Sequence, residues 1–301
     1  MSANTRIEWA DHTFNPWIGC TRVSEGCRNC YAERMAGRFG QTWGPAGERR
    51  RTAESTWKQP LAWNRQAQRE GRRYSVFPSM CDPFDDHPSI TDAMASDFGK
   101  LICDTPNLDW LLLTKRPESI EERLPVMFPP HSGHLPASLN VRIGVSVEDQ
   151  TTANERIQEL LRQWSGPNFV SYEPALGPVD FTVTWYGETA LDPGGIDWLI
   201  AGGESGPGAR PAHPDWFRSV RDQCQAAGVA FFMKQWGEWA PLDHIEERVI
   251  RCRGDLVISR AGAGRRGHPL ANPPESVFCF RIGKKAAGRL LDGREWSEFP
   301  R

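Results

Sequence analysis

After residue 70 the sequence alternates between short apolar runs and helical patterns, and this alternation restricts the chain to few architectures. Helical patterns cover residues 90–104, 151–164 and 213–228, and the last ends on Gly228, a favourable helix stop. An earlier strand at 13–20 and a helix at 29–39 bring the total to about seven β-α units. The later strands are predicted at 74–80, 109–115, 141–147, 168–174, 197–203 and 229–236.

Repeated β-α units predict a parallel sheet with right-handed crossovers, and nearly all-apolar strands indicate that both of its faces are covered. A doubly wound sheet and a barrel would both satisfy this pattern. Because polar residues recur at the C-terminal end of nearly every strand, we predict an α/β fold with a partial or full (β/α) TIM-like barrel over residues 1–240. Residues 241–301 do not continue the β-α alternation and are expected to form a small basic α+β extension that packs on the barrel. Residues 117–140 are expected to be an irregular loop, and 176–196 a small hairpin insertion.

Polar residues follow nearly every predicted strand, at the rim where barrel enzymes carry their active sites. The alternative is a set of structural ion pairs, with Glu173 and Glu204 bridging Lys115, Arg116 or Lys234. The strand-end residues are Cys20, Asp82, Lys115 with Arg116, Ser146 with Glu148, Glu173, Glu204 with Ser205, and Lys234 with Gln235.

The expected role of the eight cysteines depends on whether the protein lies in a reducing or an oxidising compartment of the cell. No apolar run is long enough to span a membrane, and the N-terminus lacks the apolar core of a signal peptide, so we expect a cytoplasmic protein that makes no membrane contact. We also expect a monomer. In a reducing compartment, clustered cysteines are metal ligands or catalytic thiols more often than disulfides. The five scattered cysteines are expected to be packed thiols: Cys81, Cys103, Cys224, Cys252 and Cys279.

Three cysteines, Cys20, Cys27 and Cys30, lie close together with the spacing C-x6-C-x2-C. A structural zinc site prefers four protein ligands, usually from two Cys-x-x-Cys pairs, and only one such pair is present. Three thiolates can instead hold three irons of a [4Fe–4S] cluster and leave the fourth iron open to a small molecule. The spacing therefore favours an iron–sulfur cluster with a reactive position.

Several motifs carry a resemblance to a known family. IEWADHTFNPWIGCTRVSEGCRNCYAERMAGR, followed by LLLTKRPE, VSVEDQ, YEPALGP, GGESGPGARP and FFMKQWG, is similar to a three-cysteine-motif family of phage and bacterial genomes. That family resembles the radical S-adenosylmethionine (SAM) enzymes, whose usual spacing is C-x3-C-x2-C, and it is distantly similar to spore photoproduct lyase, a DNA-repair enzyme. The resemblance implies a radical SAM type of barrel and no settled substrate.

The resemblance also implies roles for individual residues. Cys20, Cys27 and Cys30 would hold the cluster, SAM would occupy its open iron, and an electron donor such as flavodoxin or ferredoxin would reduce it. Cys81 is a candidate hydrogen-atom donor, with Glu173 and Glu204 as further catalytic candidates facing the same cavity. The cofactor-binding candidates are Tyr31 beside the last cysteine, Ser79 and Asp82 for the amine, Ser146 and Glu148 for the ribose, and Lys115, Ser205 and Lys234 at other strand ends.

A basic segment at residues 48–73 also contains Trp57 and Trp63. Basic residues mixed with aromatic rings suit nucleic acid, although a solvated helix face with buried tryptophans fits equally well. With the resemblance, this predicts a DNA or RNA substrate, undergoing base modification or lesion repair of a lyase type.

Two other functions fit the sequence. One is a zinc- or cluster-stabilised nucleic-acid-binding protein without radical catalysis. The other is a barrel hydrolase with Glu173 and Glu204 as an acid–base pair and purely structural cysteines.

Overall fold

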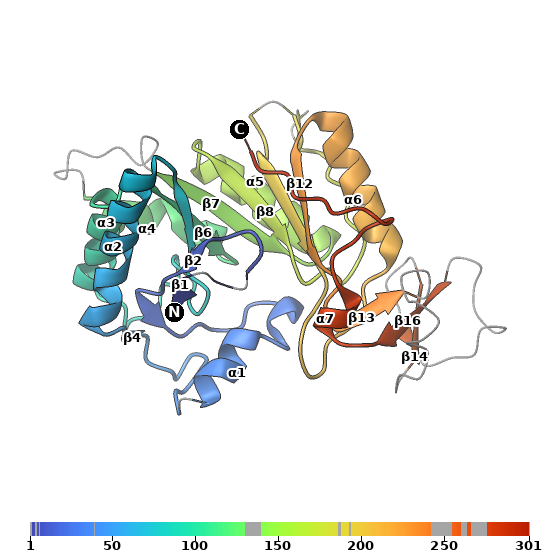
Figure 1. The fold of residues 1–301 in the computed structure, drawn as a ribbon, viewed down its shortest axis with the longest axis horizontal. Helices are drawn as coiled ribbons and strands as arrows, with labels where there is room; N and C mark the ends of the chain where they lie inside the picture. Colours follow the sequence, from blue (N-terminus) through green and yellow to red (C-terminus); the bar gives the residue numbers. More distant parts are fainter. Residues whose placement is uncertain are drawn as a thin grey trace. The chain divides into compact units, whose positions relative to one another are not determined.

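The computed structural model describes most of the chain, which divides into two compact units (Figure 1). Unit 1 comprises Met1–Val23, Cys30–Val145 and Glu159–Phe169, and unit 2 comprises Ser24–Asn29, Ser146–Gln158 and Val170–Arg301. The described residues are 2–3, 5, 7–38, 40–129, 140–185, 188–192, 194–241, 255–259, 264–265 and 276–300.

Unit 1 is built on parallel strands with helices between them. The pairs β2–β5, β5–β6 and β6–β7 are parallel, and β1 adds to β2 antiparallel. Its elements are β1 (Ser2–Ala3), β2 (His12–Thr13), β3 (Trp17–Ile18), α1 (Tyr31–Arg38), β4 (Arg50–Arg51), α2 (Glu54–Glu70), β5 (Tyr74–Phe77), α3 (Asp92–Cys103), β6 (Leu108–Thr114), η2 (Pro117–Ser119), α4 (Ile120–Met127) and most of β7 (Val141–Val147).

Unit 2 continues the same β-α pattern. The pairs β8–β11 and β11–β12 are parallel, and β9–β10 is the hairpin expected within 176–196. Its elements are η1 (Glu25–Cys27), most of α5 (Gln150–Gln163) and of β8 (Asn168–Tyr172), β9 (Thr184–Trp185), β10 (Glu188–Thr189), β11 (Trp198–Gly202), α6 (Pro214–Ala227), β12 (Ala230–Gln235), β13 (Trp239–Pro241), β14 (Asp255–Ser259), β15 (Gly264–Arg265), β16 (Ser276–Arg281) and α7 (Lys284–Ala287).

The predicted β-α alternation is confirmed. Within unit 1 the hydrogen-bonded strands follow the order β1-β2-β5-β6-β7, and within unit 2 they follow the order β8-β11-β12. This is a mixed α/β fold consistent with a partial β/α barrel. The expected strand at 13–20 is divided, because β2 pairs with β5 whereas β3 pairs antiparallel with β4.

Helix boundaries follow from local capping. The Thr91 hydroxyl accepts from the Met94 amide at the start of α3, and the His213 ring does the same for the Asp215 amide at the start of α6. Gly228 ends α6 with φ +72°, a left-handed conformation that suits glycine, so the predicted stop is confirmed. The prediction of an irregular loop from residue 117 is wrong for its first part, since η2 and α4 run through Pro117 and Pro125.

Tryptophan forms much of the core in each unit. In unit 1, Phe14 packs edge-on against Trp57 and Trp110, and in unit 2, Phe217 packs edge-on against Trp236. Helix α2 lies against β5 and β6 in unit 1 (Figure 1), and its Trp57 and Trp63 are only 7% and 6% exposed. The tryptophans of the basic segment are therefore core residues.

The C-terminal residues lie along β12. The Met233 amide donates to the Trp296 carbonyl and the Glu298 amide to the Phe231 carbonyl, while Ser297 forms an antiparallel bridge with Phe232. Strand β16 pairs with both β13 and β14, so this part has more sheet than the short β element expected.

Part of the predicted extension lies outside the described residues. This applies to residues 242–254, including Cys252, and to residues 260–263, 266–275 and 301. The boundary at 240 stays a prediction. Among the described helices, none is long and apolar enough to cross a membrane.

Helices α3 and α4 pack closely at Gly99. A Cβ added there would overlap the Met127 carbonyl, so Gly99→Ala should lower the free energy of unfolding by about 1–3 kcal/mol. The control is Gly37→Ala in α1, where nothing lies within 4 Å of the added Cβ. That change should instead stabilise by about 0.5–1 kcal/mol. Denaturant unfolding measures the free energy of unfolding of both variants. Equal changes in the two variants would contradict the close approach of α3 and α4 at Gly99.

Candidate functional site

Cys20 is fixed in unit 1 beside the end of β5. Gly19 forms a bridge with Cys81, and its amide donates to the Met80 carbonyl at 3.1 Å. At this point Gly19 has φ +131° and its α-carbon faces the Arg49 side chain, where an added Cβ would lie 2.8 Å from Cδ. Position 19 therefore requires glycine, which allows the chain to place Cys20 at the strand ends.

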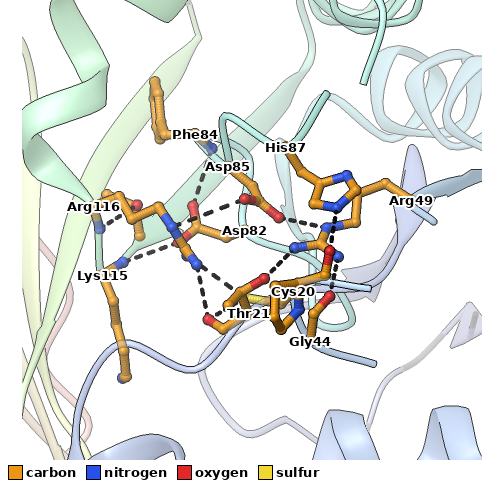
Figure 2. Close-up of polar contacts among 12 residues, drawn as sticks. Cys20, Thr21, Gly44, Arg49, Asp82, Phe84, Asp85, His87, Lys115 and Arg116 are labelled. Carbon is orange, nitrogen blue, oxygen red and sulfur yellow. Dashed lines mark hydrogen bonds and ion pairs between the residues drawn. The ribbon is translucent and has the colours of Figure 1, made fainter. Parts of the chain in front are cut away.

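Two arginine–aspartate pairs are buried next to Cys20 (Figure 2). Arg116 lies 3.0 Å from Asp82, and Arg49 lies 2.7 Å from Asp85. A third contact, 3.8 Å between Arg116 and Asp85, links the pairs into one network. All four side chains are at most 7% exposed, so their charges are balanced by each other with little help from water.

This network holds the backbone around Cys20. Arg116 donates from Nη1 to the Cys20 Sγ at 3.6 Å and from Nη2 to the Thr21 carbonyl at 2.8 Å (Figure 2). Arg49 donates to the Thr21 hydroxyl at 2.5 Å and to the carbonyls of Gly44 and Gly47. Each guanidinium therefore ties one strand-end carboxylate to the segment that carries the first cysteine.

The surroundings keep the Cys20 thiol protonated. Burial, together with the charges of Asp82 and Asp85, raises the pKa of Cys20 to about 12, while Arg116 acts in the opposite direction. Burial likewise raises the pKa of Cys81 well above its ordinary value. For Arg116 burial lowers the pKa, but Asp82, Cys20 and Asp85 more than offset it, so the guanidinium stays charged.

Cys27 belongs to unit 2, in the short turn Ser24–Asn29. The Ser24 hydroxyl donates to Glu148 Oε1 at 2.9 Å, and Asn29 Nδ2 donates to Glu204 Oε2 at 3.0 Å. Glu148 and Glu204, at the ends of β7 and β11, are 1% and 5% exposed. Two of the predicted site carboxylates, Glu148 and Glu204, thus contact the turn that carries Cys27.

Glu173 and Lys234 form a second polar group in unit 2, following β8 and within β12. Lys234 Nζ lies 2.8 and 2.7 Å from the two Glu173 oxygens, and the Lys234 and Glu173 side chains are 12% and 18% exposed. Gln235 donates from Nε2 to Glu173 Oε1 at 3.2 Å and to the Ser205 hydroxyl at 2.9 Å. The Ser146 hydroxyl donates to the Glu173 carbonyl at 3.0 Å.

The predicted site residues fall into two groups. The Tyr31 hydroxyl donates to the Ser79 carbonyl at 2.5 Å, and the Lys115 amide donates to Asp82 Oδ2 at 3.2 Å. Unit 1 carries Cys20, Cys30, Tyr31, Ser79, Cys81, Asp82 and Lys115, and unit 2 carries Cys27, Ser146, Glu148, Glu173, Glu204, Ser205 and Lys234.

The sequence predicted Lys234 as a possible ion-pair partner of Glu173, as the structure has it, but it did not predict the other partners of these residues. Arg116 directly follows Lys115 at a strand end and was visible as a charged residue there, whereas nothing local marked Arg49 or Asp85. Arg156 and Arg210, which hold Glu148 and Glu204, were likewise not predicted as site residues.

The cysteine set suits an iron–sulfur cluster in its donor chemistry. Cys20, Cys27 and Cys30 are free thiols of intermediate burial, none of them in a disulfide. Thiolates are the ligands that such clusters require. In the part of the chain that the structure describes, no three or more His, Cys, Asp or Glu side chains are gathered as a metal site.

Comparison of the sequence with known proteins gives a match to a protein family. The model of the family described as "Protein of unknown function (DUF5131)" matches residues 4–300, nearly the whole chain. No curated protein and no solved structure matches.

The buried network predicts a large cost for losing one carboxylate. Asp85→Ala would leave Arg49 buried without its partner and should destabilise the protein by about 3–5 kcal/mol. Asp104→Ala removes an exposed pair with Lys100 and should cost less than about 1 kcal/mol. Urea unfolding measures the free energy of unfolding of both variants. A similar loss of stability in the two variants would argue against the buried network.

The pKa of Cys20 predicts its alkylation profile. Because only the thiolate reacts and the pKa is about 12, the rate for Cys20 should rise about tenfold per pH unit between pH 8 and 11 without a plateau. Peptide mass spectrometry after timed iodoacetamide treatment of metal-free protein gives the rate for each cysteine. A plateau below pH 10 would contradict the effect of burial.

Proposed function

We propose that this chain, which belongs to the DUF5131 family, is a [4Fe–4S] cluster-dependent radical SAM enzyme. The observation that carries the proposal is the set of three free thiols, Cys20, Cys27 and Cys30, in one short segment whose first cysteine is fixed at the strand ends by Arg116. When bound, the cluster would supply the electron that cleaves SAM reductively to a 5′-deoxyadenosyl radical.

Arg116 supports this assignment through charge. A cluster held by three thiolates brings negative charge into a site that already holds Asp82 and Asp85. Arg116 stands against the Cys20 sulfur and donates to it, and hydrogen bonds to ligand sulfurs are one of the means by which proteins adjust such clusters. The guanidinium would stabilise the ionised sulfur.

Glu173 and Lys234 support a role in binding a small molecule. They retain some exposure, whereas the oxygens of Glu204 already accept from Asn29 and from the Arg210 amide and guanidinium. We assign Glu173 and Lys234, with Ser205, to contacts with the polar groups of SAM or substrate. Full use of the Glu204 oxygens also weighs against the paired-carboxylate hydrolase.

The proposed substrate is DNA or RNA, modified or repaired at a base. Lys58, Arg65 and Arg69 are exposed on the α2 face opposite Trp57 and Trp63, and among the described residues no ion pair involves them. Unpaired cations on one helix face suit a phosphate backbone. An electron donor such as flavodoxin or ferredoxin completes the proposed reaction.

Anaerobic reconstitution with iron and sulfide tests the proposal. Wild-type protein should turn brown with about four iron and four sulfide per chain, and with SAM and a reductant it should form 5′-deoxyadenosine. Cys27→Ala should lose both properties because one of three ligands is gone. The matched control Cys103→Ala changes a cysteine at the end of α3 and should retain them.

Other results identify the alternatives. Colourless protein with one tetrahedral zinc would support the zinc-stabilised nucleic-acid-binding protein. Turnover of a hydrolysable substrate by Cys27→Ala would support the hydrolase. Iron uptake without 5′-deoxyadenosine would leave a cluster-stabilised protein and end the radical SAM proposal.

A further inference from the structure

We infer that Glu148 and Glu204 are positioning residues that clamp the Cys27 turn. The inference deepens the proposed function and rests on it only where iron binding is concerned. It gives two predicted cofactor and catalytic residues a different role, in which the motifs VSVEDQ and GGESGPGAR hold the middle cysteine in place.

Glu148 lies directly against the first half of the turn. Its carboxylate accepts from the Ser24 hydroxyl at 2.9 Å, and a Cβ added at Gly26 would overlap that carboxylate. Residue 26 therefore has to be glycine for the turn to rest on Glu148. The Cys27 amide donates to the Ser24 carbonyl at 3.0 Å, so the anchored serine also closes the turn that presents Cys27.

Glu204 and Arg210 hold the second half of the turn. Asn29 Nδ2 donates to Glu204 Oε2 at 3.0 Å and to the Gly208 carbonyl at 2.9 Å. Arg210 Nη2 donates to the Glu25 carbonyl at 3.0 Å, and the same group donates to Glu204 Oε1 at 2.6 Å. At Gly208, with φ +79°, an added Cβ would come within 2.9 Å of Asn29 Oδ1.

Each carboxylate has its own arginine, and the Ser24 and Asn29 side chains that bind the two carboxylates carry no charge. Arg156 lies 3.1 Å from Glu148, and Arg210 lies 2.6 Å from Glu204. The arginines balance the negative charges of Glu148 and Glu204 without any contribution from the turn. The carboxylates can accept further hydrogen bonds, and they accept them from Ser24 and Asn29. These contacts occupy Glu148 Oε1 and both Glu204 oxygens.

The test removes the side-chain hydrogen bonds from the turn side. The double variant Ser24→Ala/Asn29→Ala leaves both carboxylates paired with arginine, so the fold should be retained. It removes the bonds from Ser24 to Glu148 and from Asn29 to Glu204 and to the Gly208 carbonyl. Three net hydrogen bonds of about 1 kcal/mol each correspond to roughly a hundredfold change in the opening equilibrium. In metal-free protein, hydrogen exchange of the Cys27 amide and alkylation of Cys27 should accelerate by this factor.

The controls separate clamping from general destabilisation. Thr182→Ala removes a surface hydroxyl in the same unit that donates to Asp180, and it should leave Cys27 unaffected. Alkylation of Cys20 in the double variant should stay at the wild-type rate, because Cys20 is held by Arg116. Ser24→Thr keeps the hydroxyl and, in the Asn29→Ala background, should restore part of the protection.

The outcomes also distinguish the inference from the proposed function. Wild-type rates for Cys27 in the double variant, or equal acceleration at Cys20, would overturn the clamp. Failure of wild-type protein to take up iron would overturn the proposed function while the exchange data still decide the clamp. If wild-type protein holds iron, the double variant should lose it to a chelator several-fold faster, and an unchanged loss rate would contradict positioning of the ligand.

Discussion

The buried contact between Arg116 and Asp82 is the interaction on which the unit 1 site depends. It neutralises two charges away from water, and it leaves the guanidinium donors free to hold the Cys20 sulfur and the Thr21 carbonyl. Without the arginine, Asp82 would be buried with an uncompensated charge. Arg49 repeats the same arrangement with Asp85, so the first cysteine rests on charge pairs that are expensive to separate.

In unit 2 the turn that carries Cys27 is held by a different kind of contact. There the uncharged side chains of Ser24 and Asn29 donate hydrogen bonds to carboxylates whose charges are already balanced by Arg156 and Arg210. Breaking such a bond costs far less than separating a buried ion pair. The segment around Cys20 is therefore the more firmly fixed of the two, and the Cys27 turn is attached by individually weak contacts.

The positions of strands and helices were predictable where burial leaves a simple pattern, because a strand covered on both faces is a continuous apolar run. Residues 141–147 match β7, and Gly228 marked the end of α6. Helix α4 was missed because Pro125 usually signals a break, yet near the end of a short helix it removes few hydrogen bonds. The tryptophans of residues 48–73 were ambiguous because core packing and stacking on a base use the same side chain. For the strand-end carboxylates, the residues were predictable, and so was Lys234 as a partner of Glu173, but the partners of Asp82, Glu148 and Glu204 were not. Arg49 and Asp85 are separated by 36 positions, and Asn29 and Glu204 by 175. A single sequence contains no signal that links such pairs, since each looks like an ordinary polar residue in its own segment.

The C-terminal segment at residues 295–299 has a consequence for self-association. By donating and accepting along β12, it occupies backbone groups that would otherwise be open at the margin of the parallel strands. Open strand margins recruit strands from other molecules and promote aggregation. These few residues therefore act as a cover that protects β12 from pairing with a neighbouring copy.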